Sequence, residues 1–369
     1  MTSFRERLSA FFHDQHFLPP VRLLRIYVDG PFGVGKTTTI RALTDGSFDA
    51  PVLTVREPMK YWRCFFTDLV SAVYDTSEKA SAGELSEHHV SAIMASIQAR
   101  FSDPFTALHG RIADRFGFVS GIIGQPDMVL VFDRHPAASV LCFPLARYLM
   151  GECSVEMVLS LSARLPHEPP GGNMLIADLA DEEEHVRRLT HRARPGETVN
   201  VNMLRAIRVV YNMFINTVDY ASSLCRYTEG EWEDDWRRLP WFEDGDKIAM
   251  LAPDYVIQRP QIPSADSTLL SVLKRKELCD SDGNPMRVHA WRIEAILRKI
   301  RHLNVGKISL DGKTSEECVS AFRREARDMI MTRVSFNDLY AIEADVDDFN
   351  RELGMADDAK TLDSATRRE

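Results

Sequence analysis

One segment constrains the fold of this chain more than any other, the glycine-rich stretch Gly30-Pro31-Phe32-Gly33-Val34-Gly35-Lys36-Thr37. It fits the pattern GxxxxGK[ST], follows the apolar run Leu23–Asp29 and leads into the helix-like segment Thr38–Leu43. In this context the glycines let backbone N–H groups surround phosphate oxygens, and the helix N-terminus adds partial positive charge. We therefore predict nucleotide binding, with Lys36 near the β- and γ-phosphates and the Thr37 hydroxyl on magnesium. A glycine turn beside a surface lysine is the structural alternative.

Five short apolar runs, rich in β-branched residues, alternate with amphipathic segments of helical period. The runs are Leu23–Val28, Pro51–Val55, Met128–Phe132, Asn173–Ala177 and Val305–Leu310. The helical segments include Thr37–Leu43, Val90–Arg100, Ala137–Leu149 and Met203–Leu224. Near-continuous hydrophobic runs are typical of strands that are buried on both faces of a parallel sheet. The alternation predicts the α/β class, a doubly wound parallel sheet with helices on both faces, in which ligands bind at the carboxyl ends of the strands.

The remaining segments are predicted to be peripheral to one main domain, residues 21–355. Residues 1–20 end in two prolines and are expected to form an N-terminal arm that could be mobile. Residues 229–266 mix tryptophan, proline and acidic residues, and we expect a long surface excursion of the same domain. Residues 356–369 form a polar tail that we expect to fray.

Composition excludes several classes of protein. The formal net charge of −9 argues against a surface that coats nucleic acid, since that function needs an excess of lysine and arginine. No apolar run approaches the roughly 20 residues that cross a bilayer, and the first residues make a poor signal peptide. The six cysteines are scattered without metal-ligand spacing, so we interpret them as reduced thiols. We therefore expect an intracellular protein without a membrane or nucleic-acid partner.

Charged side chains directly follow two of the predicted strands. Glu57 comes after the second strand, where it could accept the proton of a substrate hydroxyl that attacks the γ-phosphate. Asp133 follows the third strand in an arrangement that can hold magnesium, and Arg134 beside it can neutralise charge on the transferring phosphoryl group. The alternatives are a solvated or helix-start glutamate and a plain N-cap aspartate. His135 is interpreted as a scaffold residue.

Residues 181–197 combine an acidic run with several arginines, and we predict that they form a movable lid. Arg188 and Arg192 are four residues apart and so share one face of a helix, and Arg194 follows just before a Pro-Gly break. Closed over a nucleotide, these guanidinium groups could neutralise transition-state charge and exclude water. The alternative is a solvated helix whose glutamates pair with its arginines. The predicted nucleotide-binding residues are Gly30, Pro31, Phe32, Gly33, Val34, Gly35, Lys36, Thr37, Thr38, Arg188 and Arg192.

Together these pieces resemble the alphaherpesvirus thymidine kinase family, a branch of the deoxynucleoside kinases. The matching segments are Tyr27–Thr37, Glu57–Arg63, Phe132–Pro136, Ala146–Gly151 and Arg192–Glu197. Looser similarity runs from about Arg22 to Leu353. The resemblance implies a P-loop kinase with a five-stranded sheet of order 2-3-1-4-5 that uses ATP and Mg²⁺ to phosphorylate the 5′-hydroxyl of thymidine. It also implies a homodimer and a place in the cytoplasm or nucleus of a host cell.

The resemblance assigns the chemistry to individual residues of this chain. Glu57 would be the general base, and Arg134 and Arg194 would hold the 5′ end of the nucleoside. Thr37 and Asp133 would bind the metal. The predicted catalytic set is Glu57, Arg134, Lys36, Arg192 and Arg194.

The resemblance also implies a nucleoside pocket. The Gln98 amide would form paired hydrogen bonds with the thymine edge, between the rings of Phe101 and Phe143. Tyr74 and Glu197 would bind the 3′-hydroxyl. The predicted substrate-binding set is Glu57, Trp62, Val70, Val73, Tyr74, Gln98, Phe101, Phe105, Arg134, Ser139, Phe143, Arg147, Arg194 and Glu197.

Four positions depart from the best-known member of that family, which has histidine, methionine, alanine and tyrosine where this chain has Phe32, Phe101, Ser139 and Phe143. The stacking slot is kept, but its shape changes and one phenol hydroxyl is lost. Core packing remains an alternative for the two slot phenylalanines, and a helix-surface position for Gln98. Other pyrimidine deoxynucleosides, nucleoside analogues or dTMP could also be substrates. A kinase of other base preference and a nucleotide-binding regulator or NTPase without an acceptor remain open.

Overall fold

The computed structural model describes residues 20–44, 50–65, 67–117, 119–120, 124–192, 194, 196–224 and 231–354. The predicted N-terminal arm, except Pro20, and the predicted polar tail lie outside these residues. Within them, no helix is both long enough and apolar enough to pass through a bilayer.

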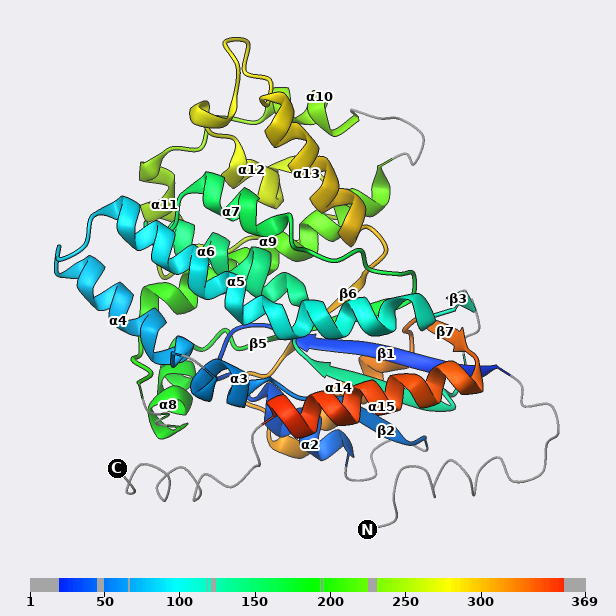
Figure 1. The fold of residues 1–369 in the computed structure, drawn as a ribbon. Helices are drawn as coiled ribbons and strands as arrows, with labels where there is room; N and C mark the ends of the chain where they lie inside the picture. Colours follow the sequence, from blue (N-terminus) through cyan, green and yellow to red (C-terminus); the bar gives the residue numbers. More distant parts are fainter. Residues whose placement is uncertain are drawn as a thin grey trace, which may run out of the picture.

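A parallel sheet forms the centre of the described chain (Figure 1). Its parallel strands are β1 (Val21–Asp29), β2 (Val52–Val55), β4 (Met128–Asp133), β5 (Gly172–Asp178) and β6 (Asn304–Ser309). They lie in the order β2-β4-β1-β5-β6, which confirms the predicted order 2-3-1-4-5 once the parallel strands alone are numbered. The carboxyl ends of these strands therefore meet at one edge of the sheet.

Two antiparallel strands complete the sheet, and the sequence analysis predicted neither of them. The strand β7 (Met331–Val334) pairs with the first residues of β1, and β3 (Val119–Ser120) pairs with β7. Both are very short, and Thr332 and Arg333 interrupt the apolar character of β7. The sequence of such a segment shows no pattern typical of a strand, because its extended conformation depends on hydrogen bonds with β1.

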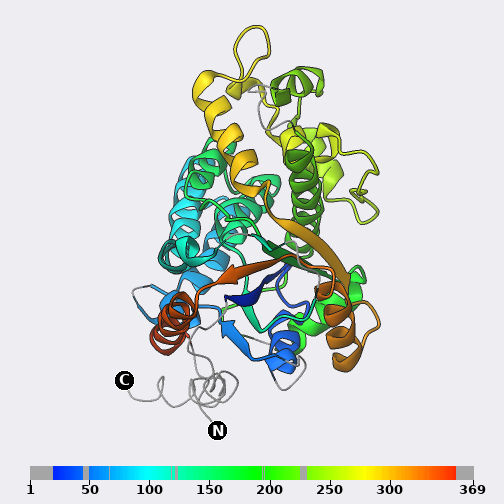
Figure 2. The same cartoon turned by 90° about the vertical axis from the view of Figure 1, so that its right-hand side faces the viewer.

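Helices cover both faces of the sheet (Figures 1 and 2). They are α2 (Lys36–Thr44), α3 (Met59–Cys64), α4 (Leu69–Ser81), α5 (Glu87–Ile112), α6 (Phe143–Leu149), α7 (Val155–Ser162), α8 (Glu182–Arg192), α9 (Val201–Ser223), α10 (Glu231–Arg238), α11 (Asp244–Met250), α12 (Leu269–Leu273), α13 (Arg287–Ile300), α14 (Ser315–Ala326) and α15 (Phe336–Leu353). Shorter helical turns are Ala113–Arg115, Ala138–Cys142, Ala265–Ser267 and Lys276–Leu278.

Strand β1 shows how the sequence builds a core on each face. Leu24, Ile26 and Val28 pack in one hydrophobic cluster with residues of α2 and α14. Leu23 and Tyr27 point the other way, into the larger cluster that α5, α6, α7 and α9 share. Alternate side chains of a strand face opposite sides of its sheet, so an uninterrupted apolar run fits a strand covered on both faces.

Residues 231–266, within the predicted surface excursion, contain the helices α10 and α11. Trp232 and Trp236 of α10 are buried, and Lys274 Nζ donates to the Trp236 carbonyl over 2.6 Å. The many acidic residues and prolines of this segment did not indicate a helix. The spacing of the two tryptophans, four residues apart on one helical face, was the available signal.

Candidate active site

The phosphate loop leaves the central strand β1 and leads into α2. Gly30, Gly33 and Gly35 have φ angles of 123°, 81° and 105°, a left-handed region that other residues rarely adopt. Lys36, the first residue of α2, donates from Nζ to two loop carbonyl oxygens at 3.1 and 2.6 Å. Its ammonium group is therefore held at the loop, where phosphate oxygens could replace those carbonyls as acceptors.

Thr37 and Asp133 form an oxygen pair beside the loop. The Thr37 hydroxyl donates to Asp133 Oδ2 over 2.8 Å, while Asp133 Oδ1 is buried without a hydrogen-bond partner. A hydroxyl and an unpaired carboxylate oxygen are ligands that magnesium accepts. In the described chain, no group of three or more histidine, cysteine or acidic residues could hold a metal ion. A magnesium ion at this pair would therefore take further ligands from phosphate and water.

Two groups at the loop have pKa values near neutrality. Burial raises the pKa of Asp133 to about 7, and the nearby Glu57 carboxylate adds to this rise. Burial lowers the pKa of Lys36 to about 7 as well, and the Arg134 guanidinium lowers it further. The free protein is therefore only partly charged at both positions at neutral pH.

Arg134 lies at the centre of the site. Of the described residues other than glycine, it alone has a positive φ, of 90°. Its Nε donates to Glu57 Oε1 over 2.7 Å, its Nη1 donates to Asp29 Oδ1 over 3.1 Å, and its guanidinium lies 5.1 Å from the centroid of the Phe143 ring. Burial opposes this charge, but Glu57 and Asp29 outweigh burial and raise the pKa of Arg134. The guanidinium thus stays charged and joins two carboxylates.

Glu57 is held in its ionised form. Burial favours the neutral carboxyl group, yet Arg134 and Lys36 together outweigh burial and keep the pKa of Glu57 below its usual value. A carboxylate that is ionised at neutral pH can accept a proton from a hydroxyl group placed beside it.

Asp29, the last residue of β1, is fully buried and fixes Arg134. Its Oδ1 also accepts from the Gly30 N–H at 2.8 Å and from the Tyr211 hydroxyl at 2.6 Å, and its Oδ2 accepts from the His135 N–H at 3.1 Å. From the sequence alone, neither Asp29 nor Tyr211 of α9 was expected in the site. For Asp29 a signal existed, because it is a carboxylate at the end of a buried strand.

A second buried carboxylate supports the segment after β4. Glu168 Oε2 lies 3.2 Å from His135 Nε2 and 3.0 Å from His109 Nε2, and Glu168 Oε1 lies 2.8 Å from Arg25 Nη2. Since His135 Nδ1 accepts from the Ala137 N–H, the hydrogen bonds assign the ring proton to Nε2. These contacts fit the scaffold role predicted for His135. No sequence motif pointed to the other three residues.

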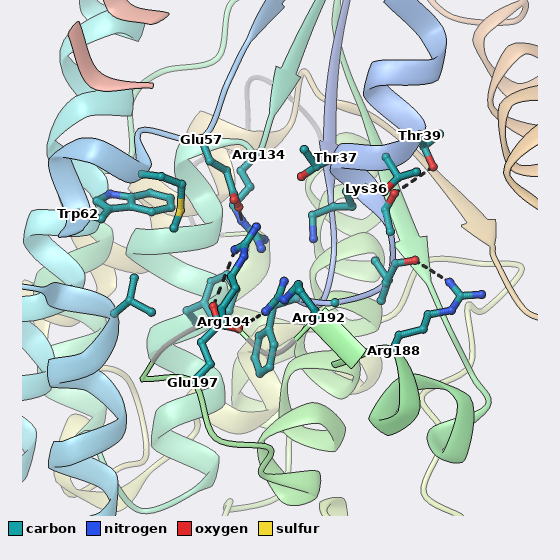
Figure 3. A pocket seen from close by; sticks show the side chains of 18 of the residues that line it. Lys36, Thr37, Thr39, Glu57, Trp62, Arg134, Arg188, Arg192, Arg194 and Glu197 are labelled. Carbon is teal, nitrogen blue, oxygen red and sulfur yellow. Dashed lines mark hydrogen bonds and ion pairs between the residues drawn. The ribbon is translucent and has the colours of Figure 1, made fainter. Parts of the chain in front are cut away.

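The loop and the predicted nucleoside pocket open into one cavity of about 560 Å³. The predicted residues that line it are Phe32, Gly33, Val34, Gly35, Lys36, Thr37, Thr38, Glu57, Trp62, Val70, Val73, Tyr74, Gln98, Phe101, Arg134, Ser139, Phe143, Arg147, Arg188, Arg192, Arg194 and Glu197. Four predicted residues do not line it, namely Gly30, Pro31, Phe105 and Asp133. Figure 3 shows Glu57 and Arg134 together, with Arg192, Arg194 and Glu197 across the cavity from Thr37.

The nucleoside end of the cavity combines aromatic rings with one amide. Gln98 and Phe101 come from α5, and Gln98 is buried where it lines the cavity. Phe143 begins α6 directly after the π-helical turn Ala138–Cys142, which interrupts the predicted helix Ala137–Leu149. Such turns are frequent at functional sites, and this one precedes a cavity-lining residue.

Phe105 lies one layer behind this pocket. Its ring centroid is 5.9 Å from that of Trp62 and 6.3 Å from that of Phe349. It comes one helical turn after Phe101 on α5 and is buried. The structure therefore places Phe105 as support for Trp62 and not in the cavity wall.

Several arginines surround the Glu197 carboxylate, which lines the same cavity. Arg192 Nη2 pairs with its Oε2, and Arg194 Nη1 and Arg63 Nη2 lie 3.8 and 3.9 Å from its Oε1. Nearby, Arg147 pairs with Glu152 at 2.5 Å. The Glu197 carboxylate is thus held at the cavity, as a contact to a sugar hydroxyl would require.

The lid region folds as α8 and a following segment. Arg188, Arg192 and Arg194 all line the cavity, whereas the residue before and the residue after Arg194 lie outside the described chain. Of the Pro-Gly break after Arg194, the structure describes only Gly196, which has a φ of 72°.

Several cavity residues were not predicted from the sequence. They are Thr39, Arg41, Met59, His191, Met203, Leu310, Lys313, Ser315 and Cys318. Four of them, from Leu310 to Cys318, follow β6. The rule that ligands bind beyond the carboxyl ends of parallel strands could have indicated this segment.

Comparisons with known proteins agree with this geometry. A family model described as thymidine kinase from herpesvirus matches residues 30–310. The thymidine kinase of Meleagrid herpesvirus 1 is 43% identical over 335 residues, which are 90% of this chain and 95% of that protein. The thymidine kinase of Gallid herpesvirus 2 is 41% identical with the same two coverages. That of Suid herpesvirus 1 is 40% identical over 91% of this chain and its own full length.

Solved structures show the same fold. A crystal structure of EHV4-TK complexed with Thy and ADP is 37% identical and superposes with a TM-score of 0.84. It covers 92% of this chain and 100% of the other. A structure of EHV4-TK complexed with TP4A, also 37% identical, gives a TM-score of 0.82 over 91% of this chain and 100% of the other.

We predict that the affinity for a magnesium nucleotide is greatest near pH 7. Below pH 7, Asp133 is protonated in the free protein, so binding of the ion releases a proton and weakens as the pH falls. Above pH 7, Lys36 is neutral in the free protein, so binding of phosphate takes up a proton and weakens as the pH rises. On each side of pH 7, the Kd should rise by up to about tenfold per pH unit, which calorimetry with Mg·ADP would measure.

The rises in Kd on the two sides of pH 7 have separate controls. Asp133→Asn should abolish the rise in Kd below pH 7 and keep the rise above pH 7. Removal of magnesium with EDTA should have the same effect. A Kd that stays level on both sides of neutrality would contradict the assignment of these two groups.

Proposed function

The chain belongs to the herpesvirus thymidine kinase family, and we propose that it transfers the γ-phosphoryl group of ATP to the 5′-hydroxyl of thymidine, giving ADP and dTMP. One observation carries the proposal. The phosphate loop and an aromatic slot with a single buried amide open into the same cavity, and Glu57 lines that cavity beside Arg134. The named activity of the relatives and the Thy and ADP in the EHV4-TK structure support it.

The nucleotide would occupy the loop end of the cavity. Lys36 would exchange its two loop carbonyls for phosphate oxygens, and Thr37 and Asp133 would hold Mg²⁺. Magnesium, when bound, neutralises negative charge on the β- and γ-phosphates. Arg192 and Arg194 line the same cavity and would stabilise charge on the phosphoryl group in transfer.

Glu57 would act as the general base. The 5′-oxygen forms a bond to the γ-phosphorus, the bond from that phosphorus to the bridging oxygen of ADP breaks, and the hydroxyl proton moves to the Glu57 carboxylate. The depressed pKa makes Glu57 a weak base but keeps it ionised. This suits phosphoryl transfer through a loose transition state, in which positioning and charge stabilisation contribute most of the catalysis.

Thymidine would lie in the slot between Phe101 and Phe143. The Gln98 amide offers one donor and one acceptor side by side, which match an edge of thymine. Arg134 lies over Phe143 and also binds Glu57, so one side chain connects the slot to the proposed base. The 3′-hydroxyl would meet Tyr74 and Glu197, which line the same cavity.

A homodimer, which the family resemblance implies, is part of the proposal. Large apolar side chains stay exposed in the described chain, among them Ile248, Ile262 and Trp291. Sedimentation analysis measures the mass directly, and a monomer at micromolar concentration would contradict this part.

Glu57→Gln is expected to lower kcat by roughly 10²- to 10⁴-fold, because the amide cannot accept the hydroxyl proton. Thymidine affinity, measured by calorimetry, should change little because the slot stays intact. The control is Glu183→Gln, which removes the same charge from an exposed position on α8. Near-normal kcat in the Glu57 variant would refute the assignment of the base.

Tyr211→Phe is expected to lower kcat by roughly 3- to 30-fold while the KM for thymidine stays within about twofold. The substitution removes only the hydroxyl that donates to Asp29, and hydrogen bonds to charged groups contribute about 1.5–3 kcal/mol. Asp29 would then hold Arg134, and through it Glu57, less firmly. A variant with a lowered melting temperature but unchanged kcat would mean that Tyr211 is only structural.

Gln98→Leu is expected to raise the KM for thymidine by roughly 10- to 100-fold, because paired hydrogen bonds to the base are lost. The same assay with all four deoxynucleosides and dTMP tests the alternative base preferences. If the variant kept the preferences of the unmodified protein, the base would be recognised elsewhere.

A further inference from the structure

The arginine-bearing helix α8 contacts the phosphate loop through one face. His185, Arg188 and Leu189 are spaced at i, i+3 and i+4, so they share that face. They meet three consecutive loop residues, Phe32, Gly33 and Val34. We refer to this set of contacts as the α8–loop contact.

Two of the contacts are hydrogen bonds to loop carbonyls. His185 Nε2 lies 2.7 Å from the Phe32 oxygen, and Arg188 Nη1 donates to the Val34 oxygen over 2.9 Å. Because a carbonyl oxygen only accepts, His185 must carry its proton on Nε2. Burial lowers the pKa of His185, so the ring is neutral and remains a single donor at neutral pH.

The third contact requires glycine in the loop. A Cβ at Gly33 would lie 2.3 Å from Leu189 Cδ2 and 2.6 Å from Leu189 Cγ, and the φ of 81° already disfavours other residues. Leu189 therefore packs directly on the backbone of the loop. A side chain at position 33 would therefore prevent this approach of the helix.

The remaining supports of α8 lie away from the loop. Its first turn is held by Arg205, which donates to Glu182 at 2.6 and 2.8 Å, and the Asp181 N–H donates to Asp311 over 2.8 Å. In its last turn, Arg192 pairs with Glu197. In the described chain, the hydrogen bonds that join the middle of α8 to another element therefore end on the phosphate loop.

We propose that His185 and Leu189 are positioning residues, which hold α8 on the loop so that Arg192 and Arg194 stay in reach of the γ-phosphate and water is kept from it. This rests on the proposed kinase function. If the contact is broken, water can attack the γ-phosphorus in place of the 5′-oxygen. The bond to the bridging oxygen of ADP then breaks, and ADP, inorganic phosphate and a proton are released.

The test measures dTMP and inorganic phosphate in the same reaction, with saturating ATP and thymidine. His185→Leu removes the donor and keeps apolar bulk, whereas His185→Gln keeps a side-chain N–H. We expect His185→Leu to lower dTMP formation by about five- to tenfold and to raise the ratio of phosphate to dTMP at least about threefold. His185→Gln should restore most of both values.

Leu189→Ala should change the ratio in the same direction as His185→Leu. Its control is Thr190→Ala, an exposed position on the same helix whose hydroxyl bonds only within the helix, and it should behave as the unmodified protein. If Leu189→Ala fails to fold, the His185 pair decides. An unchanged ratio in folded His185→Leu, or equal losses in His185→Leu and His185→Gln, would overturn the proposal.

The two proposals fail in different ways. If the unmodified protein forms no dTMP from thymidine and ATP, the proposed function is wrong. The variants could then still be compared by the rate at which each releases phosphate from ATP in the absence of thymidine. Faster phosphate release by His185→Leu and Leu189→Ala than by the unmodified protein and Thr190→Ala would uphold the role of the α8–loop contact. Equal rates of release in all four proteins would overturn it.

Discussion

The buried guanidinium of Arg134, bound between Asp29 and Glu57, is the interaction on which the rest of the site depends. It also donates to the Gly30 carbonyl and lies over the Phe143 ring, so one charge touches the phosphate loop, the proposed base and the nucleoside slot. Loss of one partner from a buried ion pair costs about 3–5 kcal/mol, because an uncompensated charge remains. The left-handed backbone of Arg134 adds roughly 1–3 kcal/mol of strain. Asp29 helps to hold this conformation, because it accepts hydrogen bonds from the Arg134 side chain and from the next peptide N–H.

The parallel sheet explains why these groups meet. Asp29 ends β1, Asp133 ends β4, and Glu57 follows β2 by two residues, and the three strands are neighbours in the order β2-β4-β1. Their carboxyl ends place three carboxylates at one edge, where like charges repel and burial disfavours ionisation. Arg134 and Lys36 offset that repulsion for Glu57, whereas the pKa of Asp133 rises to about 7. A divalent cation with the nucleotide would resolve the remaining conflict at Asp133.

What the sequence could predict follows from how local each signal is. The glycine pattern and the five apolar runs are continuous in the chain, so the loop and the strands could be predicted from them, and strand-end positions pointed to Glu57. The sheet order came from the family resemblance, because no local pattern carries it. Tyr211 and Glu168 could not be found this way, because their partners are distant in the sequence. Tyr211 binds Asp29, and Glu168 binds Arg25, His109 and His135, through pairings that only the fold creates. For the same reason β7 was not predicted, because it forms a strand only through its pairing with β1. Phe105 was expected in the substrate pocket because it follows Phe101 by one helical turn, whereas the structure packs it against Trp62 and outside the cavity lining.

The distribution of charge explains why an acidic chain can bind a polyanion. Eight lysines and arginines line the cavity against two glutamates, although the whole chain carries a formal charge of −9. Burial lowers the pKa of both Lys36 and Arg192, which means that their positive charges are costly while the cavity holds no anion. The triphosphate would offset that cost, because its negative charges attract the same groups. Relief of the repulsion between these positive charges would therefore contribute to the binding free energy. The excess positive charge is enclosed in a cavity, and this favours a small anion over the extended backbone of a nucleic acid.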